Sequence, residues 1–213
     1  MRLVDNIFNS MLGKGETEPY TYYDYLENDG NKQYIDTGVI VGGDCSIEID
    51  NFWLYKNSGN SPDWLVGARN ALNNNDYSMR GMNNGLSLRY NSDIDGYKRI
   101  AYQHYYSYQR HRNDITIYDG DTVVYHATPT LRTSAPSYNH CLFALNNAGD
   151  IVTSPYKKRL GVVRIYNDRG LVRNFHPAVR NSDGVAGMHE VVNDEFYTNA
   201  NPAGDNFLYG NLT

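Results

Sequence analysis

One stretch, "AYQHYYSYQRHR" (residues 101–112), alternates aromatic and basic residues in a pattern that could bind a ligand. In an extended strand, side chains two positions apart point to the same side, so five of these would form one row. Tyr rings could stack on sugar rings while His and Arg hydrogen-bond to hydroxyl groups. The same residue types are enriched at protein interfaces, and they also fit a solvated sheet face. The sequence therefore predicts a candidate interface or glycan face, with the solvated face as the alternative, at Tyr102, His104, Tyr106, Tyr108 and Arg110.

Other residues that could do chemistry are scattered. Cys45 and Cys141 are far apart and lie in apolar, strand-like contexts, which favours two buried thiols over a disulfide. Two cysteines alone cannot make a thiolate zinc site, and the six His residues lack metal-ligand spacing. Loop acids such as Asp119 and Asp121 follow no calcium-loop pattern. We therefore predict no metal and no cofactor.

The first segment has a pattern of its own. Between Leu3 and Leu12, apolar residues recur at helical spacing, and Gly13 and Gly15 follow as helix-ending residues. We predict an amphipathic helix and linker over residues 1–19, which either packs on its own domain or docks in a groove of another protein. The candidate docking residues are Leu3, Val4, Ile7, Phe8, Met11 and Leu12.

From Tyr20 onward the hydrophobic period changes to two. Segments such as "QYIDTGVIV", "CSIEIDNFWLY" and "DITIYDGDTVVYH" read as strands, and turn clusters separate them. Asp119-Gly120 is predicted at a hairpin tip, because Gly tolerates the positive φ of a tight turn. No amphipathic helical pattern interrupts the strands, which favours an antiparallel sandwich or barrel over a βαβ fold. We predict a single all-β domain over residues 20–213.

Composition narrows the possible functions. The chain of 213 residues has a formal net charge of −5 and no concentrated basic stripe, which argues against a nucleic-acid partner. No stretch approaches a membrane span, and the start lacks the apolar run of a signal peptide. The 20 Tyr residues suit strands with half-wet faces. Trp53 and Trp64 sit in hydrophobic runs, and we predict that both belong to the core, with a sugar-binding platform as the alternative.

Near the end of the chain, "DGVAGMHEVVNDEFYTNA" (residues 183–200) predicts a hairpin. Residues 185–189 and 195–198 would be its strands, joined by a turn at 191–194. Gly187 would let another backbone approach closely, and Met188 and Phe196 would contact the core. The stretch is therefore interpreted as closing the fold.

Two motifs carry a resemblance to a known family. "YLENDGNKQYIDTGV" (25–39) resembles the opening of concanavalin A-like (laminin-G-like) jelly-roll domains of gut bacteria and their phages. "RIYNDRGLVRNFHPAVRNSDGVAGMHEVVNDEFYTN" (164–199) resembles their end, in the same order and at a matching separation. The resemblance implies a concanavalin A-like jelly roll with a short N-terminal helix. It is poor evidence for function, because this fold hosts lectins, glucanases and structural domains.

Within the same superfamily, laminarinase-type glycoside hydrolases carry E-x-D-x-x-E on one strand, with the two Glu as nucleophile and acid/base. In "SIEIDNFW" (46–53), Glu48 and Asp50 match the first two acids, but the second Glu position falls on the Phe52-Trp53 pair. A retaining mechanism needs both carboxyls, and one is missing here, so we predict a protein that is not an enzyme. Strand alternation alone predicts that both acids face outward.

The resemblance implies a structural protein of a phage virion, of the kind that decorates capsids in crAss-like phages as an auxiliary protein. Its partner would be the major capsid protein, and its location the virion. The alternative is a carbohydrate-binding adhesin module of a head or tail fibre, which would bind host surface glycans. A glycoside hydrolase is the third hypothesis.

Overall fold

The computed structural model describes residues 18–30, 32–55, 62–70, 75–82, 85–90, 93–98, 100–130 and 134–212, with the backbone alone over 93–98. Every helix or strand assigned within these ranges is a β-strand, which confirms the predicted all-β class. None of the described segments is a helix long and apolar enough to cross a membrane. The predicted N-terminal helix lies outside the described residues, together with Leu3, Val4, Ile7, Phe8, Met11 and Leu12.

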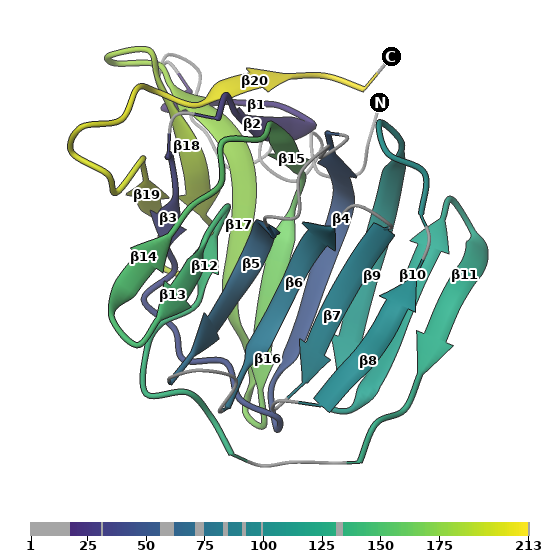
Figure 1. The fold of residues 1–213 in the computed structure, drawn as a ribbon. Coiled ribbons are helices and arrows are strands. Elements are labelled where there is room, and N and C mark those ends of the chain that lie inside the picture. The colour runs from purple at the N-terminus through teal and green to yellow at the C-terminus, as the bar shows by residue number, and fades with distance from the viewer. Residues whose placement is uncertain are drawn as a thin grey trace.

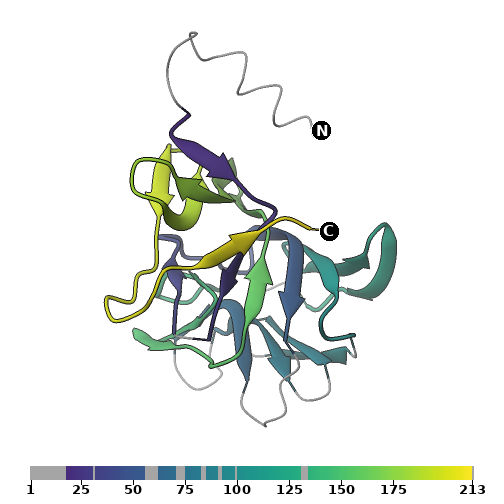
Figure 2. The same ribbon diagram turned by 90° about the horizontal axis from the view of Figure 1, so that it is seen from above.

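The larger sheet has 12 strands within the described ranges, and its main path runs β11-β10-β9-β4-β16-β17-β18-β19. At one end β1 pairs with β17, while β15 joins β4 to β2, and β20 lies alongside β2 (Figures 1 and 2). Its strands are β1 (Tyr20–Tyr22), β2 (Tyr25–Asn28), β4 (Ser46–Leu54), β9 (Tyr105–His111), β10 (Asp114–Asp119), β11 (Thr122–Ala127), β15 (Lys158–Leu160), β16 (Val163–Asn167), β17 (Gly170–Arg180), β18 (Val185–Glu190), β19 (Glu195–Tyr197) and β20 (Leu208–Gly210).

The smaller sheet has eight strands in the same ranges, with the path β14-β13-β5-β6-β7-β8. β12 pairs with β5 and β3, and β13 runs parallel to β5 while the other pairs are antiparallel. Its strands are β3 (Ile35–Asp36), β5 (Asp63–Arg69), β6 (Tyr77–Met82), β7 (Gly85–Tyr90), β8 (Asp93–Lys98), β12 (Cys141–Leu142), β13 (Leu145–Asn147) and β14 (Asp150–Val152).

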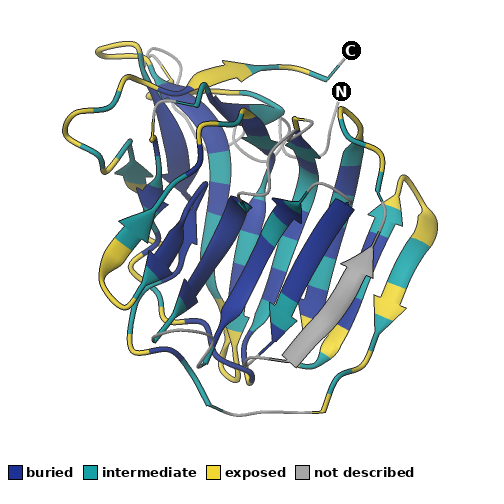
Figure 3. Cartoon of the chain, in the orientation of Figure 1, coloured by how far each residue is buried: buried dark blue, intermediate teal, exposed yellow. Residues whose placement is uncertain are grey.

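The two sheets pack face to face and enclose one apolar core (Figure 1). Alternation positions the side chains: in β4, Ile47 and Ile49 are buried, while Glu48 and Asp50 lie on the outer face of the larger sheet. Strands of the larger sheet accordingly show alternating buried and half-buried bands in Figure 3. The predicted outward orientation of the two acids is confirmed.

The predicted C-terminal hairpin is confirmed, since β18 and β19 pair across a turn at residues 191–194. Met188 is fully buried. Phe196 does not reach the core; it is half-buried and stacks on Tyr20 with ring centroids 5.2 Å apart. Gly187 allows the predicted close approach, because a Cβ there would meet the carbonyl oxygen of Tyr197.

We expect Gly187→Ala to destabilise the fold by roughly 1–3 kcal/mol, because the added methyl group meets backbone that cannot move without disturbing the β18–β19 pairing. Gly81→Ala is the matched control: its Cβ would meet the Leu54 Cδ1 methyl at 3.2 Å, the end of a flexible side chain. Urea unfolding of both variants measures the difference. A Gly81→Ala loss equal to or larger than that of Gly187→Ala would contradict this explanation.

Both cysteines are buried and free, as predicted. Burial, followed by the charge of Asp36, raises the pKa of the Cys141 thiol to about 12. That thiol is therefore protonated at neutral pH and a poor nucleophile.

Candidate functional site

The row of side chains predicted on β9 faces the core. Tyr106, Tyr108 and Arg110 are only 7, 6 and 3% exposed. The Arg110 guanidinium lies over the rings of Tyr77 and Tyr90, 5.3 and 5.7 Å from their centroids. The prediction of an accessible face at these three residues is therefore wrong. Strand alternation correctly predicted that Tyr106, Tyr108 and Arg110 share one face. That face is buried, because aromatic rings of the smaller sheet cover the arginine.

The remaining two predicted residues precede β9, and the His104 ring packs edge-on against Tyr106 with centroids 4.8 Å apart. The Tyr102 hydroxyl accepts a hydrogen bond from the backbone N–H of Gly85 at 3.2 Å, and its ring packs against the core. The exposed His104 pairs through Nε2 with Asp119 Oδ1 at 2.8 Å. The five predicted residues thus do not form one ligand-binding row.

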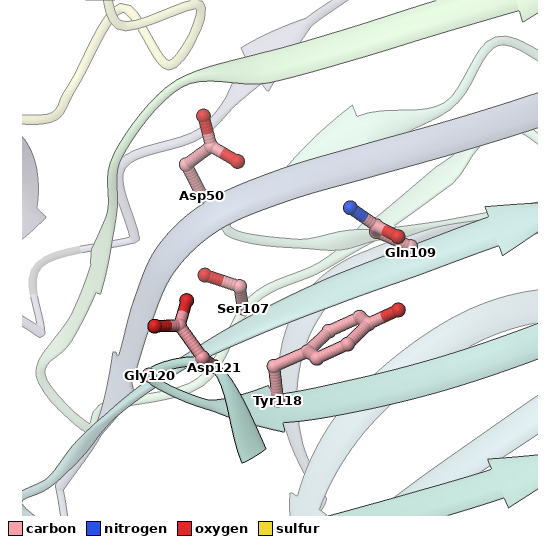
Figure 4. A pocket seen from close by; sticks show the side chains of 6 residues that line it. All are labelled: Asp50, Ser107, Gln109, Tyr118, Gly120 and Asp121. Atoms are coloured by element: carbon pink, nitrogen blue, oxygen red, sulfur yellow. The ribbon is translucent and has the colours of Figure 1, made fainter. Parts of the chain in front are cut away.

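The opposite face of β9 contributes to a pocket. Ser107 and Gln109 point outward there, next to Asp50 of β4, Tyr118 of β10, and the turn that carries Asp121. The pocket holds about 340 Å³. Figure 4 shows the oxygens of Asp50, Ser107 and Asp121 along one side and the Gln109 amide and Tyr118 ring along the other.

Gly120 sits between β10 and β11 at the predicted hairpin tip, with φ at 56°. A Cβ at Gly120 would meet nothing within 4 Å, so the glycine is required for its conformation and not for space. This tight turn brings Asp121 to the rim of the pocket.

Beside the pocket, the Arg164 guanidinium forms ion pairs with both Glu48 and Asp50 of β4. Arg164 of β16 lies 3.0 Å from Asp50 Oδ2 and 3.6 Å from Glu48 Oε2. The Tyr166 hydroxyl donates to Glu48 Oε2 at 3.1 Å, and His111 Nε2 lies 3.4 Å from Glu48 Oε1. Burial, followed by the Glu48 charge, raises the pKa of Tyr166, so this phenol stays a donor at neutral pH. The Glu48 carboxylate is thus occupied by partners from this chain.

A bulge in β4 sets the orientation of the two aromatic residues after Asp50. The register to β9 shifts between Ile49 and Phe52, and Asn51 has a φ of 58°. Phe52 therefore turns into the core, and Trp53 shares the outer face with the two acids. The prediction that both tryptophans belong to the core holds for Trp64, which is 2% exposed, and is wrong for Trp53.

The Trp53 ring is covered by an arginine. The Arg159 guanidinium lies 4.7 Å from the Trp53 centroid and 4.3 Å from that of Tyr25. Arg159 also donates to the Glu27 carboxylate and to the Tyr105 hydroxyl. The position that carries the second glutamate in the hydrolase motif thus holds an indole stacked against a cation.

Further along the larger sheet, two histidines on β17 and β18 lie next to the tyrosines of β1. The Tyr20 ring stacks on His189 at 4.1 Å, and the Tyr22 hydroxyl lies 2.6 Å from His189 Nδ1. On the adjacent strand, burial and the Arg164 charge lower the pKa of His176 to about 4, so His176 is neutral at pH 7. His189 is 3% exposed, and its Nε2 pairs with Asp194 Oδ1 at 2.8 Å, so this cluster holds β1, β17 and β18 together.

Sequence reasoning did not identify Ser107, Gln109 and Tyr118 as site residues, and it considered Asp121 only as a calcium ligand. The signal that could have found two of them is the alternation in β9: Ser107 and Gln109 are the positions between the buried residues, and they point to the opposite face. Within the described residues, no three His, Cys, Asp or Glu side chains are placed to hold a metal ion.

Comparison with known proteins adds no family assignment: the chain matches no protein-family model and no curated protein.

Proposed function

We propose that this chain is a non-enzymatic binding module whose outer face binds carbohydrate at the Asp50–Tyr118 pocket. The observation that carries the proposal is the lining itself: a hydroxyl, an amide, two carboxylates and a phenol line an open pocket of about 340 Å³. Sugar hydroxyls need this mixture of donors and acceptors, and an apolar sugar face can pack on the Tyr118 ring. The volume lies in the usual range of ligand sites, roughly 300–1,000 Å³.

Binding without turnover is supported by the surroundings of the two acids. Arg164 contacts both Glu48 and Asp50, and Trp53 replaces the second carboxyl of the hydrolase motif. A retaining mechanism needs one carboxyl as nucleophile and another as proton donor across the bond. The indole at position 53 can supply neither role.

We further propose that the sandwich is a concanavalin A-like jelly roll and that the chain belongs to a phage virion. The support is the resemblance of residues 25–39 and 164–199, which here form β2, β3 and β16–β19. The virion role has two forms, an adhesin module of a fibre or a capsid decoration protein bound to the major capsid protein. We favour the adhesin because the outer face carries the Asp50–Tyr118 pocket. Burial of Tyr106, Tyr108 and Arg110 removes that row as a contact surface for either form.

We expect the wild-type protein to bind a subset of glycans on an array, and Tyr118→Ala to bind them roughly tenfold more weakly because it removes the stacking ring. Tyr209→Ala is the matched control, since Tyr209 is a half-exposed tyrosine of β20 that does not line the pocket. Equal loss in both variants, or no glycan bound by the wild type, would contradict the proposal. Release of reducing ends from a bound glycan would contradict its non-enzymatic part.

A further inference from the structure

A lysine is enclosed between the two sheets. Lys158 of β15 and Asp63 of β5 are both 0% exposed, and Lys158 Nζ lies 2.8 Å from Asp63 Oδ1. Ser154 Oγ lies 2.8 Å from the same nitrogen and also donates to Asp63. Lysine is almost never fully buried, and burying an ion pair is costly, so this cluster differs from the aliphatic core around it.

An asparagine lies directly beside this lysine. Asn28 of β2 is the register partner of Lys158 and is itself 0% exposed. Opposite residues of an antiparallel pair point to the same side, with Cβ atoms about 5 Å apart. Within the part of the chain that the structure describes, neither Oδ1 nor Nδ2 of Asn28 has a hydrogen-bond partner, and Oδ2 of Asp63 has none either.

These orphaned atoms matter because buried polar groups are nearly always paired. The primary amine contacts the carboxyl group directly, the carboxamide extends from the register neighbour of the lysine, and all three residues are closed to solvent. Those are the three groups that amide exchange requires: a nucleophile, an electrophile and a proton carrier.

We propose that Lys158 and Asn28 form an intramolecular amide cross-link between β15 and β2, with Asp63 as the proton carrier. The Nζ lone pair attacks Cγ of Asn28, and a new C–N bond forms. Asp63, protonated at the start, delivers its proton to Nδ2 and then takes one from Nζ. The Cγ–Nδ2 bond breaks, and Nδ2 leaves as ammonia. No atom is oxidised or reduced and no co-reactant is needed.

The electrostatics of the cluster favour the reactive protonation state. Burial lowers the pKa of Lys158 and raises the pKa of Asp63, against the attraction between the two charges. Both shifts favour a neutral amine beside a protonated acid, which is the pair that attack on an amide requires. Forming the cross-link also eliminates the unpaired Nδ2 of Asn28, which leaves as ammonia. The new amide N–H, at the former Lys158 Nζ, lies beside Asp63.

The test is the intact mass of the purified full-length protein under denaturing conditions. We expect a mass lower than that of the sequence by one ammonia, and a proteolytic map in which the peptide containing Asn28 is joined to the peptide containing Lys158. An unreduced wild-type mass would overturn the proposal. Loss of one water, with Lys158 joined to Asp63, would overturn the roles assigned to Asn28 and Asp63.

Variants identify the atoms involved. Lys158→Met and Asp63→Asn should both show the full mass of their sequences, whereas Lys157→Met, the half-exposed neighbour, should keep the ammonia deficit. A deficit that persists in Lys158→Met would place the loss elsewhere in the chain and overturn the proposal. If either core variant fails to fold, the wild-type mass and peptide map still decide the question.

Discussion

Acidification from pH 6.5 to about 3 should remove roughly 4 kcal/mol of folding stability through one side chain, His140. His140 is 3% exposed, and burial, followed by the positive charge of Arg110, lowers its pKa from 6.5 to about 3. The unfolded chain binds this proton as the pH falls through 6.5, while the folded chain does not until about pH 3. Stability is therefore lost over that window as the pH falls.

Urea unfolding of the wild type and of His140→Gln at several pH values isolates this contribution from that of the carboxylates. The variant should start less stable at pH 7 and lose less stability on acidification. His176, with a pKa lowered to about 4, should give a smaller difference when replaced by Gln. Parallel pH profiles for the wild type and His140→Gln would refute this assignment.

Arg110→Ala should cost roughly 3–5 kcal/mol of folding stability, as large-to-small changes at packed aromatic sites do. The guanidinium packs on Tyr77 and Tyr90, and its Nη2 donates to the Gly42 carbonyl at 3.0 Å. Removal leaves a cavity between the rings and an unpaired buried carbonyl. Chemical denaturation of the purified variant measures the loss.

Gln109→Ala is the adjacent control. Gln109 lies on the outer face, so its loss should change stability by no more than about 0.5 kcal/mol while weakening glycan binding. The two variants thus separate the inner face of β9 from its outer face. A stable Arg110→Ala protein that has lost glycan binding would restore the row at Tyr106, Tyr108 and Arg110 as the site.

The local sequence pattern was sufficient to predict the strands and turns, because these depend on residues that are neighbours in the sequence. The period of two predicted the strands, the Asp119-Gly120 turn followed from the conformational freedom of glycine, and the hairpin at 185–198 followed from its alternation. The inward side of β9 did not follow, because a row of tyrosines with one arginine suits either face. Arg110 is buried only because Tyr77 and Tyr90 of the other sheet cover it.

The pocket depends on pairings that local pattern does not contain. Asp50 and Tyr118 meet because β9 pairs with both β4 and β10, and the bulge at Asn51 aligns Asp50 with Ser107. The Lys158–Asp63–Asn28 cluster likewise joins three strands of two sheets. A sequence pattern indicates which side chains share a face, whereas strand order decides which faces meet.

The outer face of the larger sheet is the proposed binding face of this protein. Its most direct test is a backbone-amide NMR titration of the wild-type protein with pooled oligosaccharides from β-glucan, xylan and galactan. We predict shift changes concentrated at Asp50, Ser107, Gln109, Tyr118 and Asp121, on β4, β9, β10 and the turn after β10. No shift changes, or changes concentrated on the smaller sheet, would contradict binding at this face.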